Sequence, residues 1–333
     1  MIYKDRNNAI ELMNEWGAKH QPFVFFVDYK QQHIYIEKIE NVNSEEVIYR
    51  FNEMTNENGT TTEQEKSEMV SRMQWQTFPE DFDQYEQSFD IVMKNILKGN
   101  SFLTNLTCST PIATNLSLKE IYCLAKAKYK LWVKDMFVVF SPEIFVRIKG
   151  NKISSYPMKG TIDATLPNAE QILMDDIKEA AEHATITDLI RNDLSMVSEH
   201  VQVTKYRYTD RLETIRGPIL QTSSEICGTL PKEFNRHLGE LFFKLLPAGS
   251  ITGAPKLKTT QIIEEAEHYD RRFYSGVMGS FDGYNLDSAV MIRFVEQQEE
   301  GKKVYKSGGG ITFQSDVVDE YNEMKQKIYV PIY

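Results

Sequence analysis

The sequence predicts a mixed α+β fold built on large antiparallel sheets, and three observations lead to this class. The chain has 333 residues, of which 41% are hydrophobic and 26% charged, a composition typical of a globular protein. Short apolar runs with strand character occur along its whole length. These runs do not alternate regularly with helical segments, so a doubly wound parallel sheet fits the pattern poorly.

The first half of the chain is expected to begin with a polar amphipathic helix and then a hairpin. The hairpin strands cover 22–29 and 33–36. Residues 52–68 are polar and contain Asn58-Gly59, which predicts a flexible loop or a subdomain boundary. Further predicted elements are a helix over 81–98 that ends at Gly99, strands at 102–107, 136–140 and 144–148, and a helix around 117–130.

The second half is expected to combine further strands with longer helices. A short strand over 151–156 ends at Pro157, because proline cannot donate a hydrogen bond to a neighbouring strand. The pattern then predicts, in order, a long helix over 168–190, strands near 200–208 and 217–228, helices near 236–246 and 255–268, strands at 275–282, 288–296 and 303–307, and a final helix over 316–328.

Charge and cysteine content limit the classes of partner and the compartment. Lysine and arginine number 38 against 48 acidic residues, which gives a net charge of −10. Nucleic acids and anionic membranes attract basic surfaces, so neither is expected as a partner. No apolar run is long enough to span a bilayer, and the first residues lack the apolar core of a signal peptide. Cys108, Cys123 and Cys227 are scattered and are expected to be free thiols in the cytoplasm.

Lys159 stands in the stretch Tyr156-Pro157-Met158-Lys159-Gly160-Thr161, which is expected to form a short, stiff turn at the end of a strand. Gly160 allows the backbone to turn sharply directly after the lysine. A lysine amine that is held in place and partly desolvated can act as a nucleophile. From these six residues alone, an ordinary solvated lysine is the plainer interpretation.

Two glutamates are candidates for acid–base or metal chemistry. Glu143 lies between two apolar strands, where a carboxylate can serve as a general acid or base, or can simply occupy a surface turn. Glu182 shares a helix stripe with apolar residues, and burying a carboxylate alone is costly. It must therefore be protonated, bound to a cation or paired, for example with Arg191. The neighbouring His183 is expected to be structural.

A segment of small residues, 247–256, precedes a helix and has the character of an anion cradle. Small residues let backbone amides approach an anion, and Pro255 suits a first helical turn. The segment does not match a phosphate loop, because Lys256 is not followed by serine or threonine. Its candidate ligand groups are Gly249, Ser250, Thr252, Gly253 and Lys256.

Three consecutive glycines, Gly308, Gly309 and Gly310, would remove side chains from one wall of a site. In the helix that follows, Glu320 and Glu323 share one face, as the ligands of a hard cation would. Glu323 and Lys327 also form an i,i+4 pair of the kind that a solvated helix favours.

Together these stretches resemble the chorismate-utilising enzyme family over residues 82–328. The resemblance implies a sandwich of large antiparallel sheets with helices packed outside. Residues 1–80 would form a short N-terminal region of the same fold, and 81–333 the chorismate-binding catalytic domain. The matching segments follow the family's order: 102–107, 141–143, 157–161, 181–182 with 188–193, 249–256, Arg293, 308–310 and 320–323.

The resemblance also implies an activity. Anthranilate synthases typically carry alanine at the position of Lys159, whereas a lysine there is similar to component I of aminodeoxychorismate synthases. Isochorismate and salicylate synthases use a lysine near the position of Leu103, so those activities are set aside. Such an enzyme aminates chorismate with ammonia from a separate glutamine amidotransferase subunit, and a separate aminodeoxychorismate lyase acts on its product.

The residue roles come from the same resemblance. Lys159 and Glu143 would be catalytic, with the lysine forming a covalent adduct. Glu182, Glu320 and Glu323 would bind Mg²⁺. The implied substrate contacts are Thr161, Gly249, Ser250, Thr252, Gly253, Lys256, Arg293, Gly308, Gly309 and Gly310.

Two positions depart from the family pattern. Gln221 stands where histidine is frequent, and Ser280 stands where tyrosine is usual. Glutamine cannot carry a proton at neutral pH, so elimination of pyruvate within this chain is not expected. Anthranilate formation and a non-catalytic chorismate-binding paralogue are the competing hypotheses.

Overall fold

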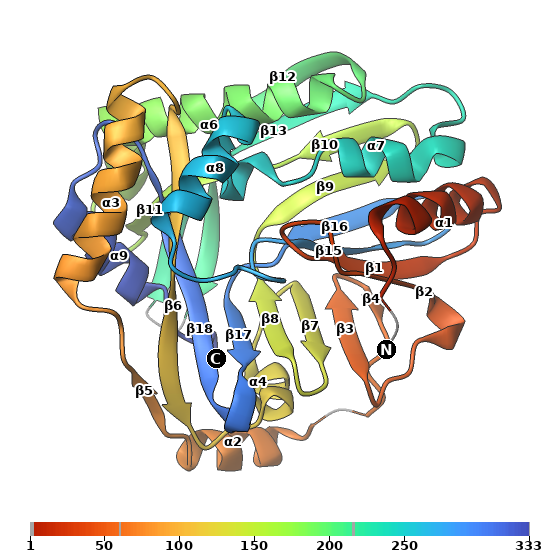
Figure 1. The fold of residues 1–333 in the computed structure, drawn as a ribbon, viewed down its shortest axis with the longest axis horizontal. Helices are drawn as coiled ribbons and strands as arrows, with labels where there is room; N and C mark the ends of the chain where they lie inside the picture. Colours follow the sequence, from red (N-terminus) through yellow and green to blue (C-terminus); the bar gives the residue numbers. More distant parts are fainter. Residues whose placement is uncertain (1–2, 60, 215–216, 333) are drawn as a thin grey trace.

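The structure, a computed structural model, describes residues 3–59, 61–214 and 217–332. Within these ranges the strands form two nine-stranded sheets, A and B, in which neighbouring strands are antiparallel. Helices lie around the outside of the two sheets (Figure 1). The predicted α+β fold with large antiparallel sheets is therefore confirmed. No helix in the described ranges is both long and apolar enough to cross a membrane.

Sheet A combines the N-terminal hairpin with strands from the middle and the end of the chain. Its strands are β1 (Phe23–Val27), β2 (Ile34–Lys38), β9 (Ile144–Lys149), β10 (Lys152–Ser155), β11 (Met158–Asp163), β12 (Glu199–Thr214), β13 (Gly217–Thr229), β15 (Val277–Phe281) and β16 (Leu286–Val290). Their order is β11-β13-β10-β9-β16-β15-β1-β2, with β12 also paired to β13. β1 and β2 pair directly, which confirms the predicted hairpin.

Sheet B is built in the same way. Its strands are β3 (Val47–Phe51), β4 (Met54–Thr55), β5 (Trp75–Thr77), β6 (Leu103–Thr114), β7 (Tyr129–Val133), β8 (Phe137–Ser141), β14 (Gly253–Ala254), β17 (Phe294–Gln297) and β18 (Lys303–Ile311). Their order is β14-β6-β18-β17-β8-β7-β3-β4, with β5 paired to β6. Strands of residues 23–55 therefore belong to both sheets.

The α-helices of the described residues are α1 (Arg6–Ala18), α2 (Glu63–Ser71), α3 (Phe82–Leu97), α4 (Leu118–Leu124), α5 (Ala169–Asp175), α6 (Ile177–Ser195), α7 (Leu238–Lys244), α8 (Lys256–Ala266) and α9 (Val317–Gln326). Short 3₁₀ turns occur at 39–41, 234–237, 249–251 and 299–301.

The alternation of side chains along the strands creates three apolar layers. Phe23 and Phe25 of β1 pack with residues of α1 and α7, whereas Val24 and Phe26 pack with residues of sheet B. A third layer lies between sheet B and the helices α3, α4, α8 and α9. The two sheets thus pack on each other, and helices cover their outer faces.

Two predicted helices differ from the observed ones. The helix predicted over 168–190 is divided into α5 and α6, because the Asp176 side chain accepts a hydrogen bond from the Glu179 amide and starts a new helix. The helix predicted around 117–130 ends at Leu124, and the chain continues into β7.

Two other segments also differ from expectation. The strand predicted over 288–296 is divided into β16 and β17, and Arg293 between them has a φ of 54°. The polar segment 52–68 contains β4 and the first turns of α2 as well as loop residues. Thr62 caps α2 through a reciprocal capping box with Glu65, a signal that lay within the polar segment.

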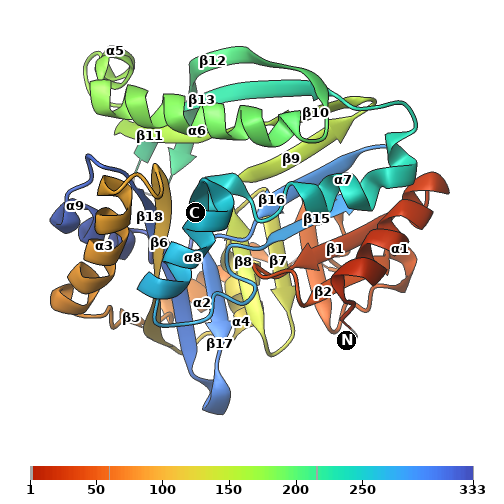
Figure 2. The same cartoon turned by 45° about the horizontal axis from the view of Figure 1, so that its top comes forward.

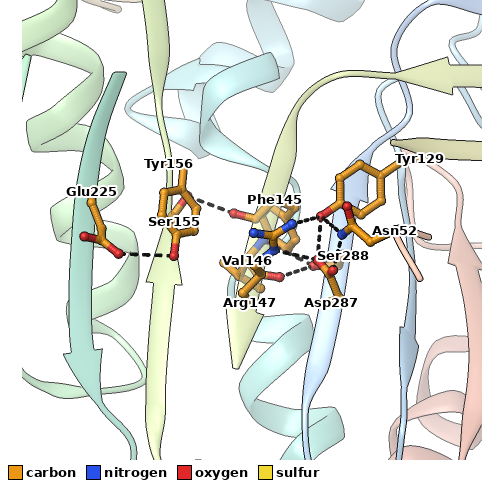
Figure 3. Close-up of polar contacts among 10 residues, drawn as sticks. All are labelled: Asn52, Tyr129, Phe145, Val146, Arg147, Ser155, Tyr156, Glu225, Asp287 and Ser288. Atoms are coloured by element: carbon orange, nitrogen blue, oxygen red, sulfur yellow. Dashed lines mark hydrogen bonds and ion pairs between the residues drawn. The ribbon is translucent and has the colours of Figure 1, made fainter. Parts of the chain in front are cut away.

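A polar cluster links the two sheets (Figure 3). Arg147 of β9 donates hydrogen bonds to Asp287 Oδ1 at 3.0 Å and to the Tyr129 hydroxyl at 2.8 Å. The Tyr129 hydroxyl donates to the same Asp287 oxygen at 2.6 Å, and the Asn52 amide donates to the other. Asp287 and Arg147 belong to sheet A and Tyr129 to sheet B, so the cluster fixes how the sheets meet.

Asp287→Ala is expected to lower the free energy of unfolding by about 1–3 kcal/mol, because it leaves Arg147 and Tyr129 without their shared acceptor. Urea unfolding measures the change. Asp90→Ala, on the exposed face of α3, is the control and should stay within about 0.5 kcal/mol of the parent. Equal urea midpoints for both variants would mean that the cluster adds no stability.

Candidate active site

Four elements from distant parts of the chain surround Lys159. β11 carries the lysine, α6 packs on β11, β12 and β13, and α9 packs on β18. Figure 2 shows α6 lying along the strands of sheet A, just above the upper ends of β6 and β18 in that view. The site is therefore assembled where an edge of sheet A meets the long strands of sheet B.

Lys159 lies inside β11 and not on the turn that the sequence predicts. The segment continues as a strand because β13 offers it pairing partners: Lys159 lies opposite Thr222, and Thr161 opposite Gln221. The register shifts between these two pairs, and Gly160 has a φ of 73°. A β-bulge of this kind bends a strand and redirects nearby side chains. The lysine is therefore carried by a paired strand.

The Lys159 amine faces an acidic partner and the glycine strand. Its Nζ lies 3.6 Å from Oε2 of Glu182, and the lysine side chain is 28% exposed. A Cβ placed on Gly310 would come within 3.4 Å of the same Nζ and 3.0 Å of Leu103 Cδ1. The amine is thus directed toward other site residues, and the missing side chain at position 310 leaves room beside it.

The other two glycines of β18 serve different contacts. A Cβ on Gly308 would lie 2.1 Å from the Leu106 carbonyl oxygen, so glycine is needed for the close approach of β18 to β6. A Cβ on Gly309 would lie 3.0 Å from Glu320 Oε2 and 3.8 Å from Glu323 Oε1. The absence of a side chain at Gly309 therefore lets β18 lie directly beside the carboxylates of α9.

Glu143 follows β8 and accepts a hydrogen bond of 2.5 Å from the Ser250 hydroxyl. Burial raises the pKa of Glu143, while the Ser250 hydrogen bond and the positive charges of Lys159 and Arg293 oppose the rise. A carboxyl group with a raised pKa can be protonated near neutral pH and deliver a proton. The charge of Lys159 acts on Glu143, so the two groups share one electrostatic environment.

Glu320 is buried and accepts a 2.7 Å hydrogen bond from Ser315. Burial raises the pKa of Glu320; the Ser315 hydrogen bond opposes the rise, and the negative charges of Glu323 and Glu182 add to it. Glu320 is therefore repelled by both of the other carboxylates, Glu182 from α6 and Glu323 from α9. A hard cation is the kind of group that would relieve this repulsion.

The carboxylates are not gathered into a complete metal site. Within the part of the chain that the structure describes, no three His, Cys, Asp or Glu side chains lie close enough together to hold a metal ion. Glu182 contacts Lys159, and Glu323 contacts Lys327. By donor type the residues fit a hard cation, while Glu182 and Glu323 are each paired with a lysine in this structure.

Lys327 is a site residue that the sequence interpretation missed, because its i,i+4 spacing from Glu323 is typical of a solvated helix. Its Nζ lies 2.6 Å from Glu323 Oε1 and donates a 2.8 Å hydrogen bond to the Gly308 carbonyl. Burial lowers the pKa of Lys327, and Glu323 opposes this effect. The signal was available: Lys327 lies on the same helix face as Glu320 and Glu323.

His183 contributes to the packing of α6. Its Nε2 lies 2.6 Å from the Ser224 hydroxyl of β13, and the ring is fully buried. Burial lowers the pKa of His183 to about 4, so the ring is neutral at physiological pH. The side chain joins α6 to β13, in agreement with the expected structural role. Arg191, the expected partner of Glu182, instead pairs with Asp188.

Packing explains much of the small-residue segment 249–256. A Cβ on Gly249 would lie 2.3 Å from Leu189 Cδ2, and one on Gly253 would lie 1.8 Å from the Leu103 carbonyl oxygen. These glycines let α6 and β6 come close to the segment. Thr252 between them is fully buried.

The Lys256 amine is occupied by an acidic side chain and a backbone carbonyl. Its Nζ lies 2.8 Å from Asp193 Oδ2 and donates a 2.7 Å hydrogen bond to the Leu245 carbonyl. It therefore joins the start of α8 to α6.

The remaining candidates occupy different surroundings. Arg293 lies between β16 and β17 with its guanidinium 5.5 Å from the centre of the Tyr329 ring. Thr161 is exposed on β11, and Gln221 lies opposite it on β13. Ser280 is buried in β15 beside β1. Of these four, Arg293 is linked electrostatically to Glu143.

A cavity of about 830 Å³ opens beside α6 and α8. Small-molecule sites commonly occupy about 300–1,000 Å³, so the cavity has a suitable size. Glu182 both lines it and contacts Lys159, which connects the amine to this space. The other lining residues include Phe102, Asp193, Lys256 and Thr312.

Comparisons with known proteins find similar sequences and a similar fold. A Haemophilus influenzae protein named "Uncharacterized PabA-like protein" is 48% identical over 332 residues, covering 100% of this chain and 99% of its own. Aminodeoxychorismate synthase component 1 of Bacillus subtilis is 28% identical over 263 residues, 74% of this chain and 54% of its own. In structure, anthranilate synthase component I of Streptococcus pneumoniae matches with a TM-score of 0.66 and 20% identity, covering 92% of this chain and 79% of its own.

The sequence profile of the chorismate binding enzymes matches residues 11–332, which is nearly the whole chain. The chain therefore belongs to the family of chorismate binding enzymes.

Proposed function

We propose that this enzyme converts chorismate and ammonia to 4-amino-4-deoxychorismate, with Lys159 as the nucleophile. The observation that carries the proposal is the orientation of the Lys159 amine, which faces Glu182 and the glycine strand at Gly310. An amine that is held in place and partly buried is suited to covalent catalysis. The name of the Bacillus subtilis relative, aminodeoxychorismate synthase component 1, supports the choice of reaction.

In the proposed first step, the ammonium group of Lys159 releases a proton to solvent, and the resulting amine forms a C–N bond to the ring while the allylic C–O bond breaks. Glu143 delivers its proton to the departing hydroxyl, which leaves as water. Ammonia then forms a C–N bond to the ring, Lys159 leaves as a neutral amine, and the Glu143 carboxylate takes the surplus proton from the new ammonium group. The sum is chorismate plus ammonia giving 4-amino-4-deoxychorismate plus water.

Arg293 is the proposed partner for a substrate carboxylate, because its positive charge is close enough to lower the pKa of Glu143. Lys256 is less suited to this role, because Asp193 and a backbone carbonyl already occupy its amine.

We also propose that Glu182, Glu320 and Glu323 bind Mg²⁺. Their oxygen donors and their mutual repulsion at Glu320 support this assignment. When bound, Mg²⁺ would neutralise the charge of a substrate carboxylate. Glu182 would then give up its contact with Lys159, which frees the amine for attack.

The proposed reaction needs ammonia, which a separate glutamine amidotransferase would supply, and a separate lyase would aromatise the product. The "PabA-like" name of the Haemophilus influenzae relative is compatible with a role beside such a partner. The proposed place of action is the cytoplasm.

The test is the mass of the product formed from chorismate, MgCl₂ and an ammonium salt, with no other protein present. The expected product is 4-amino-4-deoxychorismate. Anthranilate formed without an added lyase would identify an anthranilate synthase. Chorismate that stays unchanged at high ammonium concentration would identify a binding paralogue.

Glu323→Gln is expected to shift the magnesium titration of product formation to higher concentrations, because the amide loses one negative charge of the proposed site. Glu299→Gln, at an exposed turn, is the matched control and should titrate like the parent. If the two variants have the same magnesium dependence, Glu323 has no part in metal binding.

A further inference from the structure

A second cavity, of about 530 Å³, lies at the other end of the molecule from Lys159. It is bordered by β3, α2, α4 and β7, which Figure 1 shows in the lower part of the molecule, whereas α6 lies at the top. In sheet B, β17 and β8 stand between β18 and β7. A molecule in this cavity would therefore leave the candidate active site free.

The lining of this cavity is cationic although the chain as a whole is acidic. Two acidic residues, Glu45 and Glu57, line it, while the chain has a net charge of −10. The five basic residues that line it are Arg50, Lys66, Lys119, Lys126 and Lys130. Positive charges gathered around a cavity repel one another, and a negatively charged occupant would relieve that repulsion.

The floor of the cavity is a fixed network around Glu57. Its Oε1 accepts hydrogen bonds from the Tyr122 hydroxyl at 2.6 Å and from Arg50 Nε at 3.3 Å, and lies 3.5 Å from Lys130 Nζ. Arg50 and Lys130 lie directly opposite each other on β3 and β7. The single carboxylate of Glu57 is thus shared by Arg50 and Lys130, so the floor of the cavity carries a net positive charge.

Lys130 is the buried member of this network. It is only 8% exposed, and its Nζ donates to the Tyr122 carbonyl at 3.1 Å and lies 4.2 Å from the centre of the Tyr122 ring. Burial lowers the pKa of Lys130, whereas Glu57 opposes the change. An anion in the cavity would stabilise the charged form of this amine.

The rim carries three further lysines. Lys66 pairs at 2.8 Å with Glu63, whose side chain is 84% exposed, and such surface pairs contribute little. Lys119 and Lys126 are exposed, and the Lys119 amine lies 5.4 Å from the centre of the Trp132 ring. The exposed Lys119 amine can turn toward an anion at small cost.

We propose that this cavity binds a small polyanion, a metabolite that carries two or more carboxylate or phosphate groups. The volume of the cavity suits a small molecule, and the negative net charge of the chain disfavours a nucleic acid. The site is separate from the proposed amination site and does not depend on it.

Calorimetric titration with citrate and, separately, with pyrophosphate tests the proposal and distinguishes carboxylate from phosphate ligands. Saturable binding with a Kd of about 1 mM or below is expected for at least one of them at low ionic strength. The double variant Lys119→Gln, Lys126→Gln should weaken that binding by about tenfold or more, as expected for the loss of two charged partners.

The matched control is Lys19→Gln, Lys152→Gln, which removes the same charge from two exposed positions, one directly after α1 and one on β10. It should bind like the parent, and both double variants should keep the parent's thermal unfolding temperature. The proposal is overturned if neither anion binds saturably, if the cavity variant binds as tightly as the parent, or if the control weakens binding equally.

Discussion

Lys159→Ala is expected to eliminate a covalent chorismate adduct that intact-mass measurement should detect in the parent enzyme. Normal turnover should fall by at least about 100-fold, which corresponds to roughly 2.7 kcal/mol of lost transition-state stabilisation. The physical reason is that, without the lysine, ammonia is the only proposed nucleophile left to attack the ring. Alanine is tolerated in a paired strand, so the variant should keep its fold.

Slow direct amination is the expected residual activity of Lys159→Ala, and it should rise with ammonium concentration without saturating. Lys152→Ala, at the exposed start of β10, is the control and should keep both the adduct and the parent rate. A Lys159→Ala variant that turns over at the parent rate would show that the lysine is not the nucleophile.

Removal of Lys159 also leaves Glu182 without its ion-pair partner, so magnesium binding should strengthen.

The sequence predicted those features that depend on residues close to one another in the chain. The fold class followed from strands that do not alternate with helices, and the motifs around Lys159 and Glu143 are short enough to recognise in the chain itself. The environment of Lys159 was not predictable, because β13, which turns the expected loop into a strand, begins about 60 residues later. Pairing over such distances depends on the whole sheet.

Two lysines show that the sequence also does not reveal which group a charged side chain contacts. Lys256 had the character of an anion ligand, but its partner Asp193 lies on a helix that sequence spacing does not relate to it. Lys327 had the character of a solvated helix residue, yet the Gly308 carbonyl receives its hydrogen bond. In both cases the residue type was informative, and the partner was fixed by tertiary packing.

Glu143→Gln is expected to reduce kcat by about 10²–10⁴-fold, the usual contribution of general acid–base catalysis. Glutamine has nearly the size of glutamate and can still accept the Ser250 hydrogen bond, but it cannot release a proton. Substrate binding should therefore change much less than kcat. Steady-state rates with chorismate and ammonium measure both quantities.

The pH profile separates a catalytic role of Glu143 from a structural one. Burial raises the pKa of Glu143, so the acid form that delivers the proton persists to higher pH than it would in water. The parent rate should then fall as pH rises through this raised pKa, and Glu143→Gln should lack that descending limb. Because the Ser250 hydrogen bond lowers the pKa of Glu143, Ser250→Ala should move the limb to higher pH. A descending limb that persists in Glu143→Gln, or a Ser250→Ala profile displaced to lower pH, would remove Glu143 from the proton transfer.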